Sequence, residues 1–164
     1  MKLNKNNGIQ IGTLYKVLLG DETFAVMQFV GTDSSQLWSD VVRIFAEIFP
    51  LDARSEDVTS RNLTTRFETH TSLAAGEKLK LWSRLGAAPI DEDLQTLYRV
   101  SDDSGDPNVK RSVRWRVWSP NEEKRFVGAL TDETRTAEIG TVTNPHSLLH
   151  RIQTGQRTHF YPDG

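Results

Sequence analysis

The sequence contains no cysteine, and this absence removes several kinds of chemistry. Disulfide bonds, thiol nucleophiles and thiolate metal ligands are all excluded. A chain without cysteine fits a reducing compartment, so we expect a cytoplasmic protein. No stretch approaches the ~20 apolar residues of a transmembrane helix, and no membrane association is expected. Residues 1–11 are polar, do not form a signal peptide and are expected to be flexible.

A large excess of charge of either sign is also missing. The chain carries 20 basic and 22 acidic residues, a net charge of −2, so overall charge does not favour nucleic acid as a partner. The distribution is nevertheless uneven. Residues 91–106 contain six acidic residues and one arginine, whereas residues 110–125 contain six basic residues and two glutamates. We expect these two stretches to lie close together and to neutralise each other in part.

The chain has 164 residues, a length that favours one domain over residues 1–164. Leu, Ile, Val and Phe make up about a quarter of the sequence, above the level of roughly a fifth at which disorder is expected. A folded domain with an ordinary core and sizeable loops is therefore predicted.

Short alternating segments indicate a protein made mainly of strands. Residues 12–19 and 24–30 predict a hairpin, since a Gly-Asp-Glu turn signal separates them. Residues 40–49 fit a helical stripe as well as a strand, and their density of Val, Ile and Phe favours the strand. Residues 51–63 are polar and predict a loop. Further strands are expected at residues 64–73, 97–100, 113–118, 125–130 and 138–142.

Two segments predict short helices. Asn144 is a good N-cap, Pro145 suits the first helical position, and Gly155 stops this C-terminal helix. Residues 77–85 predict a second helix with Gly86 as its C-cap. The fold class that follows is mainly β, or β-rich α+β. We expect a strongly bent antiparallel sheet or partial barrel with the C-terminal helix packed on it.

The clearest candidate for function is the strand at residues 113–118. Arg114, Arg116 and Trp118 alternate there with apolar residues, so one face should pack on the core and the other should meet water or a partner. Arginine beside an exposed tryptophan is typical of protein interfaces and of base-stacking platforms, although a cation–π pair on a solvated sheet has the same pattern. The candidate partner-binding residues are Arg114, Arg116, Trp118, Asp102, Asp103 and Asp106.

Metal and cofactor chemistry has little support in the sequence. His146 and His150 are four residues apart on the predicted C-terminal helix, a spacing that places two imidazoles on one face. The helical zinc-protease motif requires a glutamate after the first histidine, but this chain has Ser147 there. A polar helix face explains the pair equally well. No nucleophile elbow or phosphate-binding glycine loop occurs, so we expect no metal and no cofactor.

The beginning of the chain resembles a known family. Residues 12–17, the turn at residues 20–22 and the aromatic strand at residues 24–30 are similar to the opening of immunity family twenty-six of the bacterial polymorphic-toxin systems. Residues 39–45 and several positions between residues 137 and 162 resemble uncharacterised bacterial relatives. The resemblance implies a compact β-rich domain that binds and neutralises a cognate toxin. Some members of that family carry a phosphotriesterase label, but no catalytic residue of such an enzyme maps onto this chain.

These observations lead to three hypotheses. The first is an immunity-like inhibitory module that binds a bacterial protein, such as a toxin domain, without catalysis. The second is a small phosphotriesterase-like or esterase-like hydrolase, which requires His70, His146 or His150 to meet an acid in a pocket. The third is single-stranded nucleic-acid binding by the strand at residues 113–118, although the balanced net charge disfavours it.

Overall fold

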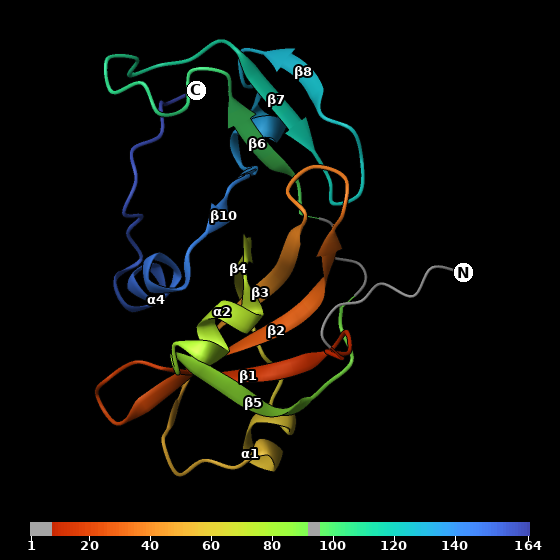
Figure 1. Cartoon of the computed structure of the whole chain (residues 1–164), viewed down its shortest axis with the longest axis vertical. Coiled ribbons are helices and arrows are strands. Elements are labelled where there is room, and N and C mark those ends of the chain that lie inside the picture. Colours follow the sequence, from red (N-terminus) through yellow and green to blue (C-terminus); the bar gives the residue numbers. More distant parts are fainter. Residues whose placement is uncertain (1–7, 92–95) are drawn as a thin grey trace.

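The computed structural model describes residues 8–91 and 96–164, and these form two β-sheets with a few short helices (Figure 1). The expectation of a flexible N-terminus falls largely on residues 1–7, outside the described residues. The strands are β1 (Thr13–Leu18), β2 (Thr23–Asp33), β3 (Ser39–Pro50), β4 (Thr65–Thr71), β5 (Trp82–Ala87), β6 (Tyr98–Ser101), β7 (Trp115–Trp118), β8 (Arg125–Gly128), β9 (Glu138–Ile139) and β10 (Val142–Thr143). The helices are α1 (Ser55–Thr59), α2 (Leu73–Lys78), α3 (Asp132–Arg135) and α4 (Pro145–Thr154).

The two sheets differ in size and in strand order. The large sheet has the order β10-β4-β3-β2-β1-β5, and the small sheet has the order β8-β7-β6-β9. β10 pairs with β4 in parallel, and β9 pairs with β6 in parallel, whereas the other pairs are antiparallel. The expected β-rich class with a C-terminal helix is confirmed. The expectation of one bent antiparallel sheet or partial barrel is wrong, because the chain forms two mixed sheets and neither is closed or curled.

Both faces of the large sheet are covered. On one face, Leu73 of α2 and Leu148 of α4 pack against inward side chains of β1, β2 and β3, including Met27. On the other face, Val58 of α1 belongs to a second apolar cluster with Phe24 of β2. These contacts explain why short helices with little intrinsic stability persist here, since packing of an apolar face supplies most of their stability.

The predicted hairpin and the strand at residues 40–49 are confirmed. β1 and β2 pair across a turn in which Gly20 has a φ of +86°, a conformation that glycine adopts without strain. β3 extends over Ser39–Pro50 and pairs with both β2 and β4. It lies in the middle of the sheet, which explains its high content of Val, Ile and Phe.

Three predictions of local structure are wrong. The polar segment at residues 51–63 includes the helix α1, and residues 77–85 do not form one helix. Instead α2 ends at Lys78 and β5 begins at Trp82. The indole nitrogen of Trp82 donates to the Leu73 carbonyl at 3.0 Å, and a Cβ at Gly76 would lie 1.9 Å from the Trp82 ring. This tertiary packing of Trp82 on α2 overrides the helical pattern. The third wrong prediction is a single strand at residues 138–142, because the chain there forms β9, which pairs with β6, and β10, which pairs with β4.

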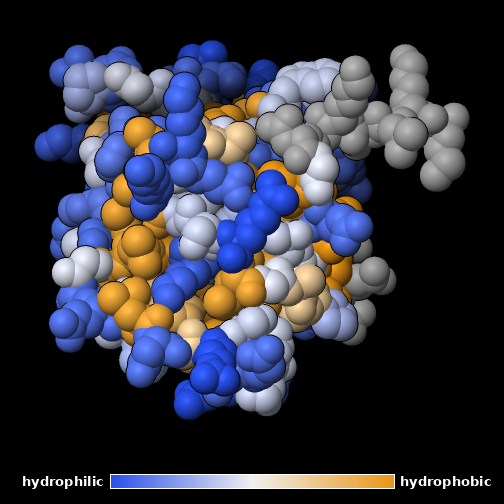
Figure 2. Space-filling model, turned by 60° about the horizontal axis from the view of Figure 1, so that its bottom comes forward, coloured by the Kyte–Doolittle hydropathy of each residue, from blue (hydrophilic) through white to orange (hydrophobic). Residues whose placement is uncertain are grey.

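The C-terminal helix forms as the sequence predicts. Pro145 is its first residue, and the Asn144 side chain accepts a hydrogen bond from the backbone nitrogen of Ser147 at 2.9 Å. Gly155 caps the C-terminal end with a φ of +77°. Among the described residues, no helix is long and apolar enough to cross a bilayer. Figure 2 shows the face at the bottom of Figure 1, where apolar surface occurs in separate patches between hydrophilic side chains.

Candidate functional site

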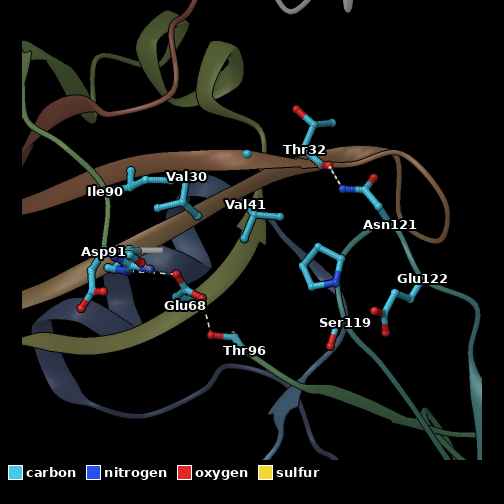
Figure 3. A pocket seen from close by; sticks show the side chains of 13 residues that line it. Val30, Thr32, Val41, Glu68, Ile90, Asp91, Thr96, Ser119, Asn121 and Glu122 are labelled. Atoms are coloured by element: carbon cyan, nitrogen blue, oxygen red, sulfur yellow. Dashed lines mark hydrogen bonds and ion pairs between the residues drawn. The ribbon is translucent and has the colours of Figure 1, made fainter. Parts of the chain in front are cut away.

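A pocket of about 360 Å³ lies where the β7–β8 turn approaches the large sheet. Figure 3 shows Glu68 and Asp91 on one side of it and Asn121 and Glu122 on the opposite side. Its volume lies in the range of small-ligand pockets, about 300–1,000 Å³. The lining residues are Val30, Gly31, Thr32, Val41, Arg43, Glu68, Ile90, Asp91, Thr96, Ser119, Pro120, Asn121 and Glu122.

A buried ion pair forms part of the pocket wall. Arg43 on β3 stands directly opposite Glu68 on β4, and Arg43 Nε donates to Glu68 Oε2 at 2.9 Å. The two side chains are only 3% and 6% exposed. The Thr96 hydroxyl donates to the other oxygen of Glu68, and Arg43 Nη2 donates to the Asp91 carbonyl at 3.2 Å. Buried charges are stable only when they are paired and hydrogen-bonded, and Arg43 and Glu68 meet both conditions. These contacts hold the two side chains in place, so this wall is a fixed polar surface.

Next to this pocket, one buried carboxylate joins the two sheets. Asp33 is the last residue of β2, and its Oδ2 accepts hydrogen bonds from His70 Nε2 of β4 and Trp118 Nε1 of β7, each at 3.0 Å. Asp33 and His70 are fully buried and Trp118 is 2% exposed. Tyr98 of β6 packs its ring against both His70 and Trp118. The connection between the sheets is therefore a polar centre enclosed by aromatic rings.

The other oxygen of Asp33 holds the tip of the β2–β3 hairpin. Oδ1 accepts from the backbone nitrogens of Gln36 at 3.1 Å and Asn121 at 3.4 Å. The backbone nitrogen and hydroxyl of Ser34 both donate to the Asn121 side chain, at 2.9 and 2.8 Å. The Ser35 hydroxyl donates to the Glu122 carbonyl at 3.0 Å. The β7–β8 turn thus fixes the hairpin tip on a second side.

The contacts of Asp33 with His70 and Trp118 form the joint between the two sheets. The hydrogen bonds to Asp33 determine the charge states of Asp33 and His70 in this joint. Burial alone would raise the pKa of Asp33, but donors from Trp118, Gln36 and His70 together lower it to about 2. Burial lowers the pKa of His70 despite the carboxylate beside it. At neutral pH Asp33 is ionised and accepts a hydrogen bond from the Nε2–H group of a neutral His70. The Nδ1 atom of His70 has no partner among the described residues.

The hairpin tip exposes a large aromatic side chain. Trp38 is 78% exposed, whereas Trp82, Trp115 and Trp118 are 2%, 1% and 2% exposed. Its φ is +49°, in the left-handed region that is rare for a bulky residue. The neighbouring Leu37 packs against the aromatic cluster around Trp118, so the tip is anchored while the Trp38 ring points away from the core.

The predicted partner-binding strand looks different in the structure. Trp118 is buried and its indole binds Asp33, so the expectation that it lies exposed beside the arginines is wrong. Arg114 and Arg116 are exposed, as expected, with side chains 59% and 40% accessible. The expected proximity of the acidic and basic stretches is confirmed, because Arg116 Nε lies 3.1 Å from Asp102 and Arg114 Nη1 lies 3.4 Å from Asp103.

Asp106 has a local role in the loop at residues 102–106, where its side chain accepts a hydrogen bond from the backbone nitrogen of Asn108 at 2.9 Å.

The hypothesis of single-stranded nucleic-acid binding required exposed aromatic rings on β7. Trp115 and Trp118 are both buried, so β7 presents arginine without tryptophan to solvent.

The three candidate histidines do not share one site in the described part of the chain. His70 is fully buried with Asp33, whereas His146 and His150 are exposed on α4. His70 does meet an acid, Asp33, but both side chains are fully buried and neither lines the pocket described above, and His146 and His150 do not join them. In the part of the chain that the structure describes, no group of three or more His, Cys, Asp or Glu side chains is placed to hold a metal ion.

Sequence reasoning missed the most connected residues of this region. The sequence patterns assign no functional role to Asp33, Trp38 or Asn121. An aspartate followed by two serines is a signal for a turn in which the carboxylate accepts backbone N–H groups. That signal was present for Asp33, but nothing local indicated that Trp38 would be exposed and Trp118 buried.

Comparison with known proteins adds no assignment. No protein-family model, curated protein or solved structure matches this chain. The resemblance to immunity proteins therefore stays a prediction, and function has to be argued from the residues described above.

Proposed function

We propose that this chain is a protein-binding module that uses Trp38 at the tip of the β2–β3 hairpin as an anchor. The observation that carries the proposal is the 78% exposure of Trp38 on a tip that is tied to the rest of the molecule. Tryptophan is enriched among residues that dominate binding energy at protein interfaces. A large exposed ring offers apolar area that only a partner would remove from water.

The hairpin tip also has the rigidity that an anchor needs. Asp33 Oδ1 and the Asn121 side chain restrain the backbone on both sides of the tip through the hydrogen bonds at residues 34–36. A surface that is already ordered loses less conformational entropy on binding. The left-handed φ of Trp38 further supports a specialised role, since such backbone positions occur where function or packing requires them.

The pocket adjoins this anchor and suits the same role. Asn121 and Glu122 line the pocket and also bind the hairpin tip. A partner that covers Trp38 would meet the pocket mouth, where a polar side chain of the partner could reach the wall formed by Arg43 and Glu68. The proposed contact face therefore comprises the hairpin tip, the β7–β8 turn and the pocket.

The class of partner follows from the resemblance at the beginning of the chain. Similarity to immunity proteins supports a bacterial toxin domain, bound in the cytoplasm and neutralised without catalysis. Arg114 and Arg116 with the loop at residues 102–106 remain a second candidate face, because both arginines are exposed. Their pairing with Asp102 and Asp103 lowers the expected contribution of each charge.

The experiment is affinity capture from the native host, followed by calorimetry with the purified partner. Trp38→Ala should weaken binding by roughly 30-fold or more, which corresponds to about 2 kcal/mol. Phe160→Ala is the matched control, since Phe160 is another exposed aromatic residue, 52% accessible, in a different part of the chain. Expression of the partner alone should stop bacterial growth, and co-expression of this chain should restore it.

Other outcomes would redirect the assignment. Loss of affinity in the Arg114→Ala/Arg116→Ala variant, with Trp38→Ala unchanged, would place the interface on the small sheet. A partner that binds all variants equally well would contradict both faces. A captured partner that does not affect growth would leave a binding module but overturn the immunity role.

A further inference from the structure

A second pocket, of about 600 Å³, lies on the small-sheet side of the molecule and is rich in positive charge. Arg99 of β6, Lys110 and Arg111 before β7, and Arg135 at the end of α3 all line it. Asp163 is the one carboxylate side chain among the described lining residues, which leaves an excess of positive charge. Segments far apart in the sequence thus converge on one basic cavity.

The backbone fixes this convergence. The Asp163 backbone nitrogen donates to the Lys110 carbonyl, and the Ser112 nitrogen donates to the Asp163 carbonyl, both at 2.8 Å. These bonds hold the C-terminal segment against the loop that precedes β7, in the region near the C-terminus in Figure 1. The Arg135 guanidinium donates to the Gly164 carbonyl at 3.0 Å and is held at the pocket edge.

The cations of this pocket are not neutralised by a neighbouring acidic side chain, unlike six arginines elsewhere in the molecule. Arg43, Arg84, Arg114, Arg116, Arg151 and Arg157 each lie within 4 Å of a carboxylate. Within residues 8–91 and 96–164, no ion pair with an aspartate or glutamate side chain involves Arg99, Lys110, Arg111 or Arg135, although Arg135 donates to main-chain oxygens of Leu130 and Gly164. Unpaired positive charges gathered in one cavity repel each other, and a bound anion would relieve that repulsion.

Arg99 is the most constrained of the four. Its guanidinium carbon lies 4.9 Å from the centre of the buried Trp115 ring, and its Nε is buried without a hydrogen-bond partner among the described residues. Burial lowers the pKa of Arg99, and the positive charge of Arg135 lowers it further. A buried donor without an acceptor has an energetic cost that a ligand oxygen would remove.

We propose that this pocket binds the phosphate groups of a small soluble molecule. Guanidinium groups match phosphate oxygens through paired N–H donors, and a dianion suits the excess positive charge better than a single carboxylate does. The pocket is open to solvent, and its volume of about 600 Å³ exceeds what one phosphate fills, so an organic part of the ligand could lie beside the phosphates. This site is independent of the Trp38 hairpin and does not require a protein partner.

The test is isothermal titration calorimetry of the full chain at constant ionic strength. Inorganic pyrophosphate serves as the probe for the phosphate part, and ADP serves as a probe that also carries an organic part. We expect saturable binding of pyrophosphate at one site. Tighter binding of ADP would indicate that the pocket also holds the nucleoside, whereas equal affinity would limit recognition to the phosphates.

Two double variants with the same change in net charge make the test specific. Lys110→Gln/Arg111→Gln, at two exposed positions of the pocket, should weaken pyrophosphate binding by about tenfold or more. Arg114→Gln/Arg116→Gln removes two surface cations outside the pocket and should leave binding unchanged. Thermal unfolding of each variant would show that it is folded.

Two results would overturn the proposal. The first is an absence of saturable pyrophosphate binding in the millimolar range. The second is equal weakening by both double variants, since that would show attraction to total charge without a defined site.

Discussion

The two regions that meet at Asp33 make opposite use of tryptophan. On β7, Trp118 lies in a strand with an alternating pattern that predicts an exposed face, yet the structure buries it against Asp33. At the hairpin tip, Trp38 follows a polar turn with no pattern, yet it is 78% exposed. The comparison shows that exposure of an aromatic residue is set by what covers it, because local periodicity identifies two faces but not which one is buried.

The same carboxylate stabilises both regions through different oxygens. Oδ2 binds His70 and Trp118 and joins the sheets, whereas Oδ1 binds the backbone of the hairpin tip and of the β7–β8 turn. A substitution of Asp33 should therefore destabilise both the joint between the sheets and the hairpin tip. Substitutions of Trp118 and of Trp38 should each affect only one of these two regions.

The largest effect is expected for Asp33→Ala. This change leaves buried donors from His70, Trp118 and the hairpin backbone without an acceptor, and should lower the free energy of unfolding by about 3–5 kcal/mol. Urea denaturation followed by tryptophan fluorescence measures it. Asp102→Ala, which removes an exposed carboxylate, is the control and should leave the transition almost unchanged. A small loss in Asp33→Ala would mean that the joint is not a main source of stability.

Acid should weaken the same joint. The pKa of Asp33 is about 2 in the folded protein against an ordinary value of 3.8, so its ionised form contributes about 2 kcal/mol at pH values above about 4. That contribution is lost as the pH falls towards 2. The lowered pKa of His70 adds a loss that begins below its ordinary value of 6.5.

Denaturation at a series of pH values would test this. Asp33→Asn should remove the part of the acid dependence between about pH 4 and pH 2, whereas Asp106→Asn, at an exposed position, should retain it. An unchanged acid dependence in Asp33→Asn would assign the effect to other carboxylates.

Trp118→Phe should have an intermediate effect, confined to the joint. The change removes one hydrogen bond to Asp33 and leaves a small cavity beside Gly140, where a Cβ would lie 1.8 Å from the Trp118 ring. We expect a loss of roughly 1–2 kcal/mol in unfolding free energy. If Trp118→Phe is as stable as the unaltered protein, the interior position of this ring is in doubt.

Trp38→Gly should have the smallest effect on stability. Glycine tolerates the φ of +49°, and the ring has no interior packing to lose. Its greater freedom in the unfolded chain offsets part of this gain, so the free energy of unfolding should stay within about 1 kcal/mol of the original value or rise slightly. A large loss of stability would show that Trp38 has a structural role and would weaken its assignment as an anchor.

Local chemistry determined the parts of the fold that the sequence predicted correctly. The β1–β2 hairpin follows from its turn and alternation, β3 from its run of β-branched and aromatic residues, and α4 from Asn144, Pro145 and Gly155. Each of these signals acts over a few residues, so it is readable without knowledge of the rest of the chain.

The candidate site depended on contacts that sequence spacing does not report. Arg43 and Glu68 were both visible as charges, but only their opposite positions on β3 and β4 make them a buried pair. The basic cavity likewise combines Arg99 with residues from three other segments. Propensity and periodicity contain no information on such distant pairs.

By itself, then, the sequence determined that this is a β-rich chain with a capped C-terminal helix and with neighbouring acidic and basic stretches. The tertiary structure alone decided that two sheets form and that Asp33 joins them. It also decided that Trp118 is interior while Trp38 is exposed. The physical reason is that backbone preferences and alternation are local, whereas burial of a face requires a second surface, which here comes from strands that are distant in the sequence.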